Sequence, residues 1–293
     1  MTFGRVAILG PGLMGGSIAL ALAERGLVGR LVIYDRSAAR LEEIRAAGVP
    51  AELTDDPREA VREADVVILC VPIEAMAGLV REIRDALKPT ALVTDVGSVK
   101  GSVVGEIEPL LGDRAFWIGS HPMAGSEQSG FAAAHSDLFE NAAVIVTPTA
   151  QTRPEAVERA GQFWQALGGR VVRLSPEVHD DRVAQISHLP HLLAAALVCE
   201  TSEEALDLAA GGFRDTTRVA SGSPELWTEI LSANAETVAC RLAGLIHYLQ
   251  ALQAALEKAD EPSSRLALRT MLKKAQHARS QIPESKSKLK KHS

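Results

Sequence analysis

Three glycines near the start of the chain have the spacing of a phosphate-binding turn. Gly10, Gly12 and Gly15 lie between the apolar run RVAILG and the segment GGSIALALAERG. The first glycine permits a tight turn, the second lets a pyrophosphate approach the backbone, and the third lets helix and strand pack closely. The phosphates would bind at the helix N-terminus, whose N–H groups favour an anion. We therefore expect this turn, including Leu13 and Met14, to bind a dinucleotide.

An acidic residue strengthens that prediction, because the glycine pattern alone is weak evidence. Asp35 ends the next strand-like run, RLVIYD, twenty residues after Gly15. At this place a carboxylate binds the adenosine ribose hydroxyls and repels a 2′-phosphate. The pattern favours NAD over NADP as the cofactor. Arg36 and Arg40 lie close by and could stack on adenine or accept a phosphate, so the strictness of that preference stays open.

Two further segments carry residues that could take part in chemistry. Ser98 stands in DVGSVK, and His121 in the polar segment GSHPMAGSEQSG that follows the apolar run AFWI. Both segments stand at the carboxyl ends of predicted strands, as does CVP with Val71 and Pro72. Ligands of open α/β sheets bind beyond the carboxyl ends of the strands. We expect these residues at one crevice with the nicotinamide, although Ser98 could be a helix N-cap, a ligand or both, and His121 an ordinary loop residue.

The elements that must position these residues follow from the alternation of apolar runs and helical segments. Strands are expected at RVAILG, RLVIYD, ADVVILCVP, ALVTDVG, AFWIGS, AAVIVTP and RVVRLS, with helices between them. Such alternation predicts a Rossmann-type α/β fold, a doubly wound, mostly parallel sheet with both faces covered. We assign this dinucleotide-binding domain to residues 1–176.

Beyond residue 176 the strand pattern stops, and the sequence predicts an all-helical second domain over residues 177–281. Helices are expected at roughly 177–200, 202–210, 224–258 and 263–280. The remaining residues, 282–293, are rich in lysine and poor in apolar side chains, which is typical of a disordered basic tail.

Composition sets limits on the class of protein. The 293 residues are 46% hydrophobic and 23% charged, and the net charge of −6 argues against nucleic-acid binding. The sequence has no unbroken run of about 18 apolar residues, so we expect no membrane span. Cys70, Cys199 and Cys240 lack metal-ligand spacing, so we expect them to be buried apolar residues in a reducing, cytoplasmic compartment and expect no metal site.

The motifs together resemble the prephenate/arogenate (cyclohexadienyl) dehydrogenase family of tyrosine biosynthesis. The resemblance covers nearly the whole chain and rests on GPGLMGGSIA, DVGSVK, SHPMAGSE, ISHLPHLLA and GFRDTTRVASGSPELW, in this order. It implies a helical second domain that forms a homodimer. It also implies oxidative decarboxylation of prephenate to 4-hydroxyphenylpyruvate, with hydride transfer to NAD+. Arogenate carries an ammonium where prephenate carries a keto group, and these residues do not distinguish the two substrates.

The resemblance also implies roles for individual residues of the first domain. His121 would accept a hydrogen bond from the C4 hydroxyl of the substrate ring, which suits a neutral histidine acting as base. Ser98 would orient His121 and the nicotinamide. Ser120, beside His121 in the sequence, would belong to the substrate site.

The second domain would supply the remaining contacts. His188 and His191 are three residues apart, on one helical face, with Pro190 expected to kink the helix. Without a third ligand nearby, this pair is poor evidence for metal, and it could also be a surface or core pair. The resemblance places His188 near the nicotinamide, His191 near the substrate side chain, Arg218 on a substrate carboxylate, and Trp227 in the partner subunit's site.

Two other functions compete with this interpretation. A β-hydroxyacid dehydrogenase would usually place a lysine on the interdomain helix, where this sequence has no obvious candidate. A non-catalytic NAD-binding sensor would keep the glycine turn but would not need Ser98, His121 and Arg218 together.

Overall fold

The computed structural model describes residues 2–125 and 128–282, so the predicted tail from residue 283 onward lies outside the described residues. The described residues form an eight-stranded sheet in the order β3-β2-β1-β4-β5-β6-β7-β8. Its strands are β1 Phe3–Leu9, β2 Val28–Tyr34, β3 Glu52–Thr54, β4 Val66–Leu69, β5 Leu92–Asp95, β6 Phe116–Pro122, β7 Ala143–Thr147 and β8 Arg170–Arg173. Only the β6–β7 pair is antiparallel among these strands. The predicted mostly parallel Rossmann-type sheet is confirmed.

The helices of the sheet region are α1 Leu13–Glu24, α2 Ala38–Ala46, α3 Pro57–Val61, α4 Ile73–Ile83, α5 Gly101–Leu111 and α6 Pro154–Ala166, with short 3₁₀ turns η1 Arg84–Ala86 and η2 Phe131–Ala133. Beyond the sheet come α7 Pro176–Val183, the π-helix η3 Ala184–His188, α8 Leu189–Cys199, α9 Glu203–Leu206, α10 Gly211–Thr217, the 3₁₀ turn η4 Arg218–Ser221, α11 Pro224–Ala233, α12 Ala235–Glu257 and α13 Pro262–Ser280. The helical character predicted after residue 176 is confirmed.

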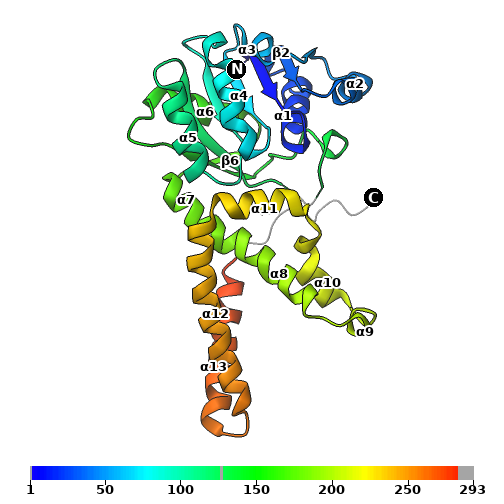
Figure 1. Cartoon of the computed structure of the whole chain (residues 1–293), viewed down its shortest axis with the longest axis vertical. Helices are drawn as coiled ribbons and strands as arrows, with labels where there is room; N and C mark the ends of the chain where they lie inside the picture. Colours follow the sequence, from blue (N-terminus) through cyan, green and yellow to red (C-terminus); the bar gives the residue numbers. More distant parts are fainter. Residues whose placement is uncertain (1, 126–127, 283–293) are drawn as a thin grey trace. The chain divides into compact units, whose positions relative to one another are not determined.

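Helices cover both faces of the sheet (Figure 1). Side chains of a strand point alternately to its two faces. Val6 and Ile8 of β1 therefore pack in one core with α1 and α6, while Ala7 and Leu9 pack in a second core with α3, α4 and α5. Burial on both sides explains why the strands are continuously apolar rather than alternating.

The chain divides into two compact units at a different place from the predicted domain boundary. The first unit, Met1–Val238, holds the sheet together with α7 to α11, and the second is Ala239–Ser293. The boundary after residue 176 stays a prediction about separately folding domains.

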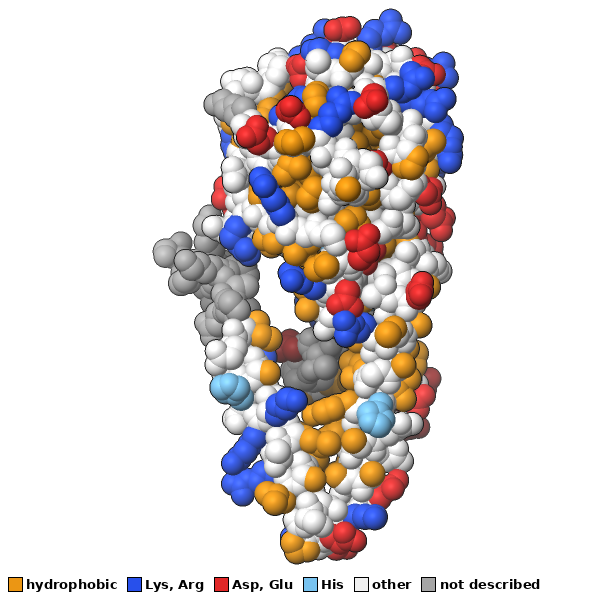
Figure 2. Space-filling view, turned by 90° about the vertical axis from the view of Figure 1, so that its left-hand side faces the viewer, with side chains coloured by type: hydrophobic (Ala, Val, Ile, Leu, Met, Phe, Trp, Pro, Cys, Tyr) orange, Lys and Arg blue, Asp and Glu red, His pale blue; other side chains and the backbone are white. Residues whose placement is uncertain are grey.

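The second unit, described by itself, exposes large apolar side chains on its two helices, and its hydrophobic surface is visible in the lower part of Figure 2. These side chains are Ile246, Tyr248, Leu249, Leu256, Leu266 and Leu272. None of the helices within the described ranges combines the length and apolar character that a bilayer span requires.

Several details of the helices differ from the prediction. The helix expected at 177–200 contains the π-helical segment η3 between α7 and α8, and Pro190 follows as the second residue of α8. The helix expected at 224–258 is two helices, because Asn234 leaves helical geometry between α11 and α12. The helix expected at 202–210 is the single turn α9.

The predicted burial of the cysteines was also wrong for two of the three. Cys70 is half-buried, whereas Cys199 and Cys240 are exposed. Cys199 ends α8, a helix that leaves other apolar side chains, Leu193 and Leu197, partly exposed as well.

Candidate active site

The glycine turn has the geometry that the sequence predicts. Gly10 has a φ of +96°, and a Cβ there would lie 2.9 Å from the carbonyl oxygen of Cys70. A Cβ on Gly15 would lie 2.4 Å from the carbonyl oxygen of Gly10, so only glycine permits this approach of helix to turn. A Cβ on Gly12 would meet nothing within 4 Å. Gly12 is the N-cap of α1 without a side-chain cap, so the helix N-terminus is open toward an anion.

Asp35 lies just after β2, at the same edge of the sheet as the glycine turn. One carboxylate oxygen, Oδ1, accepts a hydrogen bond of 2.8 Å from the Ser37 N–H. The other, Oδ2, lies 3.8 Å from Nε of Arg40. The carboxylate is thus held in place at the end of β2, with 14% of the Asp35 side chain exposed. This arrangement fits a ribose-binding carboxylate, with Arg40 beside it.

The remaining predicted cofactor residues lie around the turn. Leu13 and Met14 are the first residues of α1. Val71 follows β4 and is adjacent to Gly10, because a Cβ on Gly10 would lie 2.9 Å from its side chain. Pro72 immediately precedes α4 and is its N-cap residue.

His121 lies on a strand, not in a loop as predicted. It is part of β6 and pairs with Ile145 of the antiparallel strand β7. Only 8% of the residue is exposed. The strand extends past the apolar run AFWI because the following polar groups have partners inside the protein.

Ser120, the residue before His121, occupies the opposite face of β6. It is fully buried, and its hydroxyl contacts the Thr94 hydroxyl at 2.7 Å and accepts a hydrogen bond of 3.1 Å from the Trp164 indole. We therefore assign this side chain to the structural interior, in place of the predicted contact with substrate.

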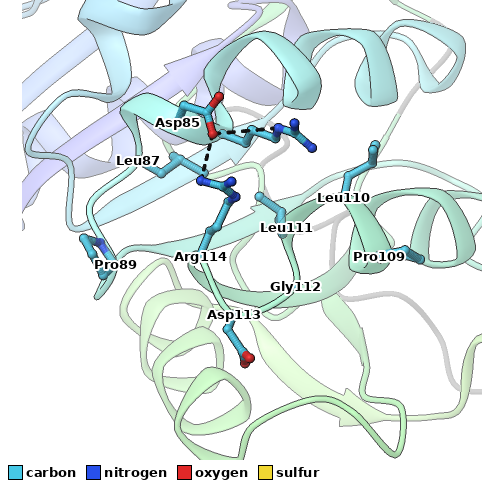
Figure 3. Close-up of a pocket in the computed structure, with 10 residues that line it drawn as sticks. Asp85, Leu87, Pro89, Pro109, Leu110, Leu111, Gly112, Asp113 and Arg114 are labelled. Carbon is cyan, nitrogen blue, oxygen red and sulfur yellow. Dashed lines mark ion pairs between the residues drawn. The ribbon is translucent and has the colours of Figure 1, made fainter.

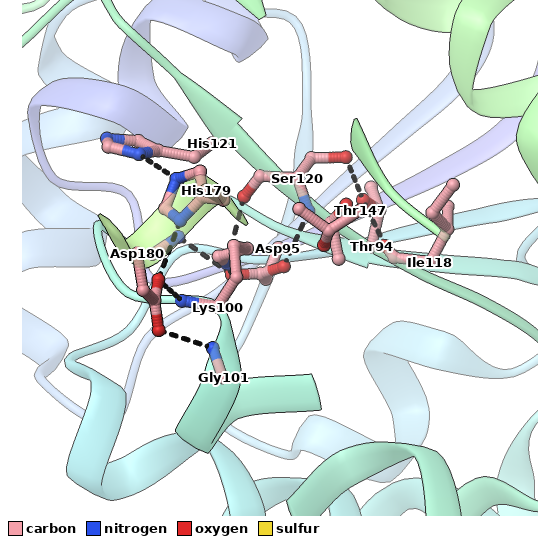
Figure 4. Close-up of polar contacts among 12 residues, drawn as sticks. Thr94, Asp95, Lys100, Gly101, Ile118, Ser120, His121, Thr147, His179 and Asp180 are labelled. Atoms are coloured by element: carbon pink, nitrogen blue, oxygen red, sulfur yellow. Dashed lines mark hydrogen bonds and ion pairs between the residues drawn. The ribbon is translucent and has the colours of Figure 1, made fainter. Parts of the chain in front are cut away.

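The partners of His121 come from α7 (Figure 4). Its Nδ1 lies 2.8 Å from Nε2 of His179. The Nδ1 of His179 in turn lies 2.7 Å from Oδ1 of Asp180. Sequence reasoning missed both residues of this pair, although the adjacent His and Asp in PEVHDDRV are a recognisable signal.

Asp180 also closes the N-terminus of α5. Its carboxylate accepts hydrogen bonds from the N–H groups of Lys100, at 2.8 Å, and Gly101, at 2.7 Å. A carboxylate is favourable there because the N–H groups of a helix start lack helical partners. Ser98 is therefore not the N-cap that the sequence allowed. It is half-buried in the loop between β5 and α5.

Beneath this site lies an ion pair that sequence reasoning also missed. Lys100 and Asp95 are both fully buried and in direct contact through Nζ and Oδ2. The ammonium also donates to the carbonyl oxygen of Ser120 at 3.0 Å. Asp95 accepts hydrogen bonds from the N–H groups of Gly97, at 2.8 Å, and Ser120, at 2.9 Å. The pair thus fixes the loop that carries Ser98 to the strand that carries His121.

Burial keeps the histidines of this site neutral. It lowers the pKa of His121 well below its usual value, with further lowering by His179, Lys100 and His188. Burial also lowers the pKa of His179, against the opposing hydrogen bond to Asp180. The pKa of His188 falls to about 4 for the same reason. A neutral imidazole at His121 can accept a proton at neutral pH.

A second group of side chains lies further along the helical segment. His188 is buried at the end of η3, and its Nδ1 lies 3.3 Å from Nδ2 of Asn234. His191 stacks on Trp227, with ring centroids 3.6 Å apart and an angle of 13° between the planes. Both rings of the predicted pair thus contact Trp227 of the same chain, because His188 lies with its ring centroid 6.2 Å from that of Trp227. Arg218 begins η4 and is exposed.

A pocket of about 710 Å³ opens elsewhere, around the Asp85–Arg114 ion pair of 2.8 Å (Figure 3). Its lining comes from the segments that lead into β5 and β6, and so lies at the amino ends of these strands. It is therefore at the edge opposite the glycine turn, and we do not assign it to the active site.

Comparisons with known proteins match both parts of the chain. The family model for the prephenate dehydrogenase nucleotide-binding domain matches residues 18–173, and the model for the prephenate dehydrogenase dimerization domain matches residues 175–274. Cyclohexadienyl dehydrogenase of Zymomonas mobilis is 36% identical over 285 residues, which cover 92% of this chain and 97% of that protein.

Solved structures are similar over almost the whole length. Prephenate dehydrogenase from Aquifex aeolicus, in complex with hydroxyphenyl propionate and NAD+, has a TM-score of 0.87 and 32% identity, covering 97% of this chain and 99% of that one. Synechocystis arogenate dehydrogenase has a TM-score of 0.80 and 31% identity, covering 94% and 99%.

The buried ion pair gives a test of how the site is held together. We expect Lys100→Met to lower the free energy of unfolding by about 3–5 kcal/mol, because it leaves the Asp95 carboxylate buried without its cation. Lys88→Met is the matched control, since Lys88 pairs with Asp65 at 2.6 Å but both side chains are about one-third exposed. We expect Lys88→Met to lower the free energy of unfolding by less than about 1 kcal/mol. Urea unfolding measures both, and equal losses would contradict the role of the buried pair.

Proposed function

Because the chain belongs to the prephenate dehydrogenase family, we propose that it catalyses the NAD+-dependent oxidative decarboxylation of prephenate to 4-hydroxyphenylpyruvate. The observation that carries this proposal is the neutral imidazole of His121, which is hydrogen-bonded to His179. His121 lies on β6 of the same sheet in which β1 leads into the glycine turn. Arogenate is the second candidate substrate, because the similar proteins include an arogenate dehydrogenase and a cyclohexadienyl dehydrogenase.

The proposed reaction divides the work between protein and substrate. His121 accepts the proton of the C4 hydroxyl as the C–H bond at C4 breaks. Bound NAD+ would accept the hydrogen of this C–H bond as a hydride. The ring carboxylate leaves as CO2, and its bonding electrons complete the aromatic ring. The protein therefore needs only to place the substrate and to accept one proton, and the proposed reaction requires no redox group besides NAD+.

The cofactor assignment is supported by the residues around the turn. The open N-terminus of α1 at Gly12 would hold the pyrophosphate, and Asp35 would bind the adenosine ribose. Val71, Pro72 and Ser98 follow β4 and β5 and would lie along the nicotinamide half.

The substrate assignment rests on the helical segment. We propose that His188 lies near the nicotinamide and His191 near the substrate side chain, with Trp227 stacked against His191. Arg218, exposed at the start of η4, would bind a carboxylate through its planar fork. The match to a dimerization domain and the exposed apolar side chains of α12 and α13 support a homodimer.

Incubation of the protein with NAD+ and either prephenate or arogenate tests this function directly. We expect NADH absorbance to rise with prephenate and CO2 to be released in equal amount. Initial rates on the two substrates determine the preference. NADH formation with arogenate alone would move the assignment to the second candidate. An absence of NADH with both substrates would contradict the proposal.

The role of His121 predicts a specific pH dependence. The base must be neutral, and its pKa lies below the usual value, so kcat should hold through pH 6.5 and fall only as the pH drops through that lowered pKa. His121→Asn should reduce kcat about 10²–10⁴-fold, change both KM values little, and remove this acid limb. His277→Asn, on the exposed surface of α13, is the control. Near-normal kcat with an intact acid limb would make His188 or His191 the next base to test.

Asp35 predicts the choice of cofactor. Asp35→Ser removes the charge that opposes a 2′-phosphate and leaves Arg40 nearby, so KM for NAD+ should rise and KM for NADP+ should fall. Asp113→Ser, at the opposite edge of the sheet, should change neither value. Steady-state kinetics with both cofactors measure the effect. A wild-type preference for NADP+ would contradict the assignment of Asp35.

A further inference from the structure

His121 is the first of three side chains that are hydrogen-bonded in a row, and the other two come from α7. We propose that His179 and Asp180 are positioning residues that fix the proton of His121 on Nδ1. This tautomer leaves the lone pair on Nε2, which is the atom that accepts the substrate proton. The inference rests on the proposed function, because it states which nitrogen of the proposed base reacts.

Asp180 sets the direction of the first hydrogen bond in the row. Its two oxygens accept hydrogen bonds from the N–H groups of Lys100 and Gly101, which are donors that cannot reverse their role. A group that accepts from the start of a helix is favoured as the carboxylate, and a carboxylate only accepts. The Nδ1 of His179, 2.7 Å from Oδ1, must therefore carry a hydrogen and donate it.

His179 sets the tautomer of His121 in the same way. His179 is fully buried, and burial lowers its pKa, so the ring is neutral and has one hydrogen. That hydrogen is on Nδ1, so Nε2 is an acceptor. The Nδ1 of His121, 2.8 Å away, must then be the donor. The opposite tautomer of His121 would place two lone pairs against each other at this distance.

The pair is fixed in place by groups on several elements. Asp180 holds the N-terminus of α5 through its carboxylate, and its carbonyl oxygen accepts a hydrogen bond of 3.0 Å from the Asn234 side chain. The charged and titratable groups that act on the two rings are His188, Lys100, Asp95 and Asp180. Of these, only Asp180 forms a hydrogen bond with either ring in the described residues, so it alone sets the direction of the row.

Asp180→Leu should remove that direction. Leucine is of similar size but offers no acceptor to Nδ1 of His179, so the hydrogen of His179 is no longer held on Nδ1. His121 would then be a mixture of its two tautomers, with the lone pair at the reacting Nε2 in only part of the molecules. kcat should therefore fall while the KM values change little.

Nitrogen-15 NMR of protein labelled at histidine reads the tautomer without measuring activity. In the wild type, His121 should show a protonated, pyrrole-type Nδ1 and a pyridine-type Nε2, assigned by their loss in His121→Asn. In Asp180→Leu each of the two nitrogens should show a mixture of both types. Because Asp180 also holds α5, this variant could fail to fold, and substitutions at His179 provide an independent test.

His179→Gln and His179→Leu are a matched pair of similar size. The Gln amide can accept from His121 with its oxygen and donate to Asp180 with its nitrogen, so it should keep the Nδ1–H tautomer and most of kcat. Leu offers no acceptor, so His121 should show a mixture of tautomers and a reduced kcat.

The outcomes separate this inference from the proposed function. Unchanged His121 signals in both Asp180→Leu and His179→Leu would overturn the inference, whatever the activity. A mixture of tautomers with a normal kcat would support the inference and would instead contradict His121 as the base. A mixture of tautomers together with a reduced kcat would support both.

Discussion

The carboxylate of Asp180 is the contact on which the arrangement of the site depends. Only 6% of the residue is exposed, and a buried carboxylate is costly unless its oxygens are hydrogen-bonded. The N–H groups of Lys100 and Gly101 and the imidazole of His179 supply those bonds. The donors belong to α7 itself and to the start of α5, about 80 residues away in the chain. One buried charge therefore fixes the first helix beyond the sheet against the helix that follows β5.

The fold and the cofactor turn could be predicted from the sequence because their signals are local. The three glycines each act on neighbours in the turn or at the adjoining strand end, and Asp35 simply ends a strand. The rest of the site could not be predicted in this way. Lys100 and Asp180 meet only in the folded chain, and nothing in the local pattern around either residue indicates the other. The sequence DVGSVK drew attention to Ser98, whereas the structure shows that Asp95 and Lys100 of the same segment form the buried pair.

The position of His121 could be predicted only in part. Its place at the carboxyl end of the sheet followed from the strand before it, but the strand was expected to stop at the polar residues. It continues because Ser120 finds Thr94 and Trp164 on one face, and His121 finds His179 on the other. Polarity indicates a loop only when polar groups need water, and here each group has a partner inside the protein.

Successive side chains of β6 point to opposite faces of the sheet, and the two faces have different roles. Ser120 points into the core beneath α6, while His121 points toward α5 and α7. Gly119, on the same face as His121, has no side chain, and a Cβ there would lie 2.8 Å from Val104 and 3.3 Å from Lys100. The missing side chain therefore leaves room for the Lys100 stem, which passes Gly119 to reach Asp95. A cation in that position disfavours a second positive charge nearby, and so it helps to keep the His121 imidazole neutral.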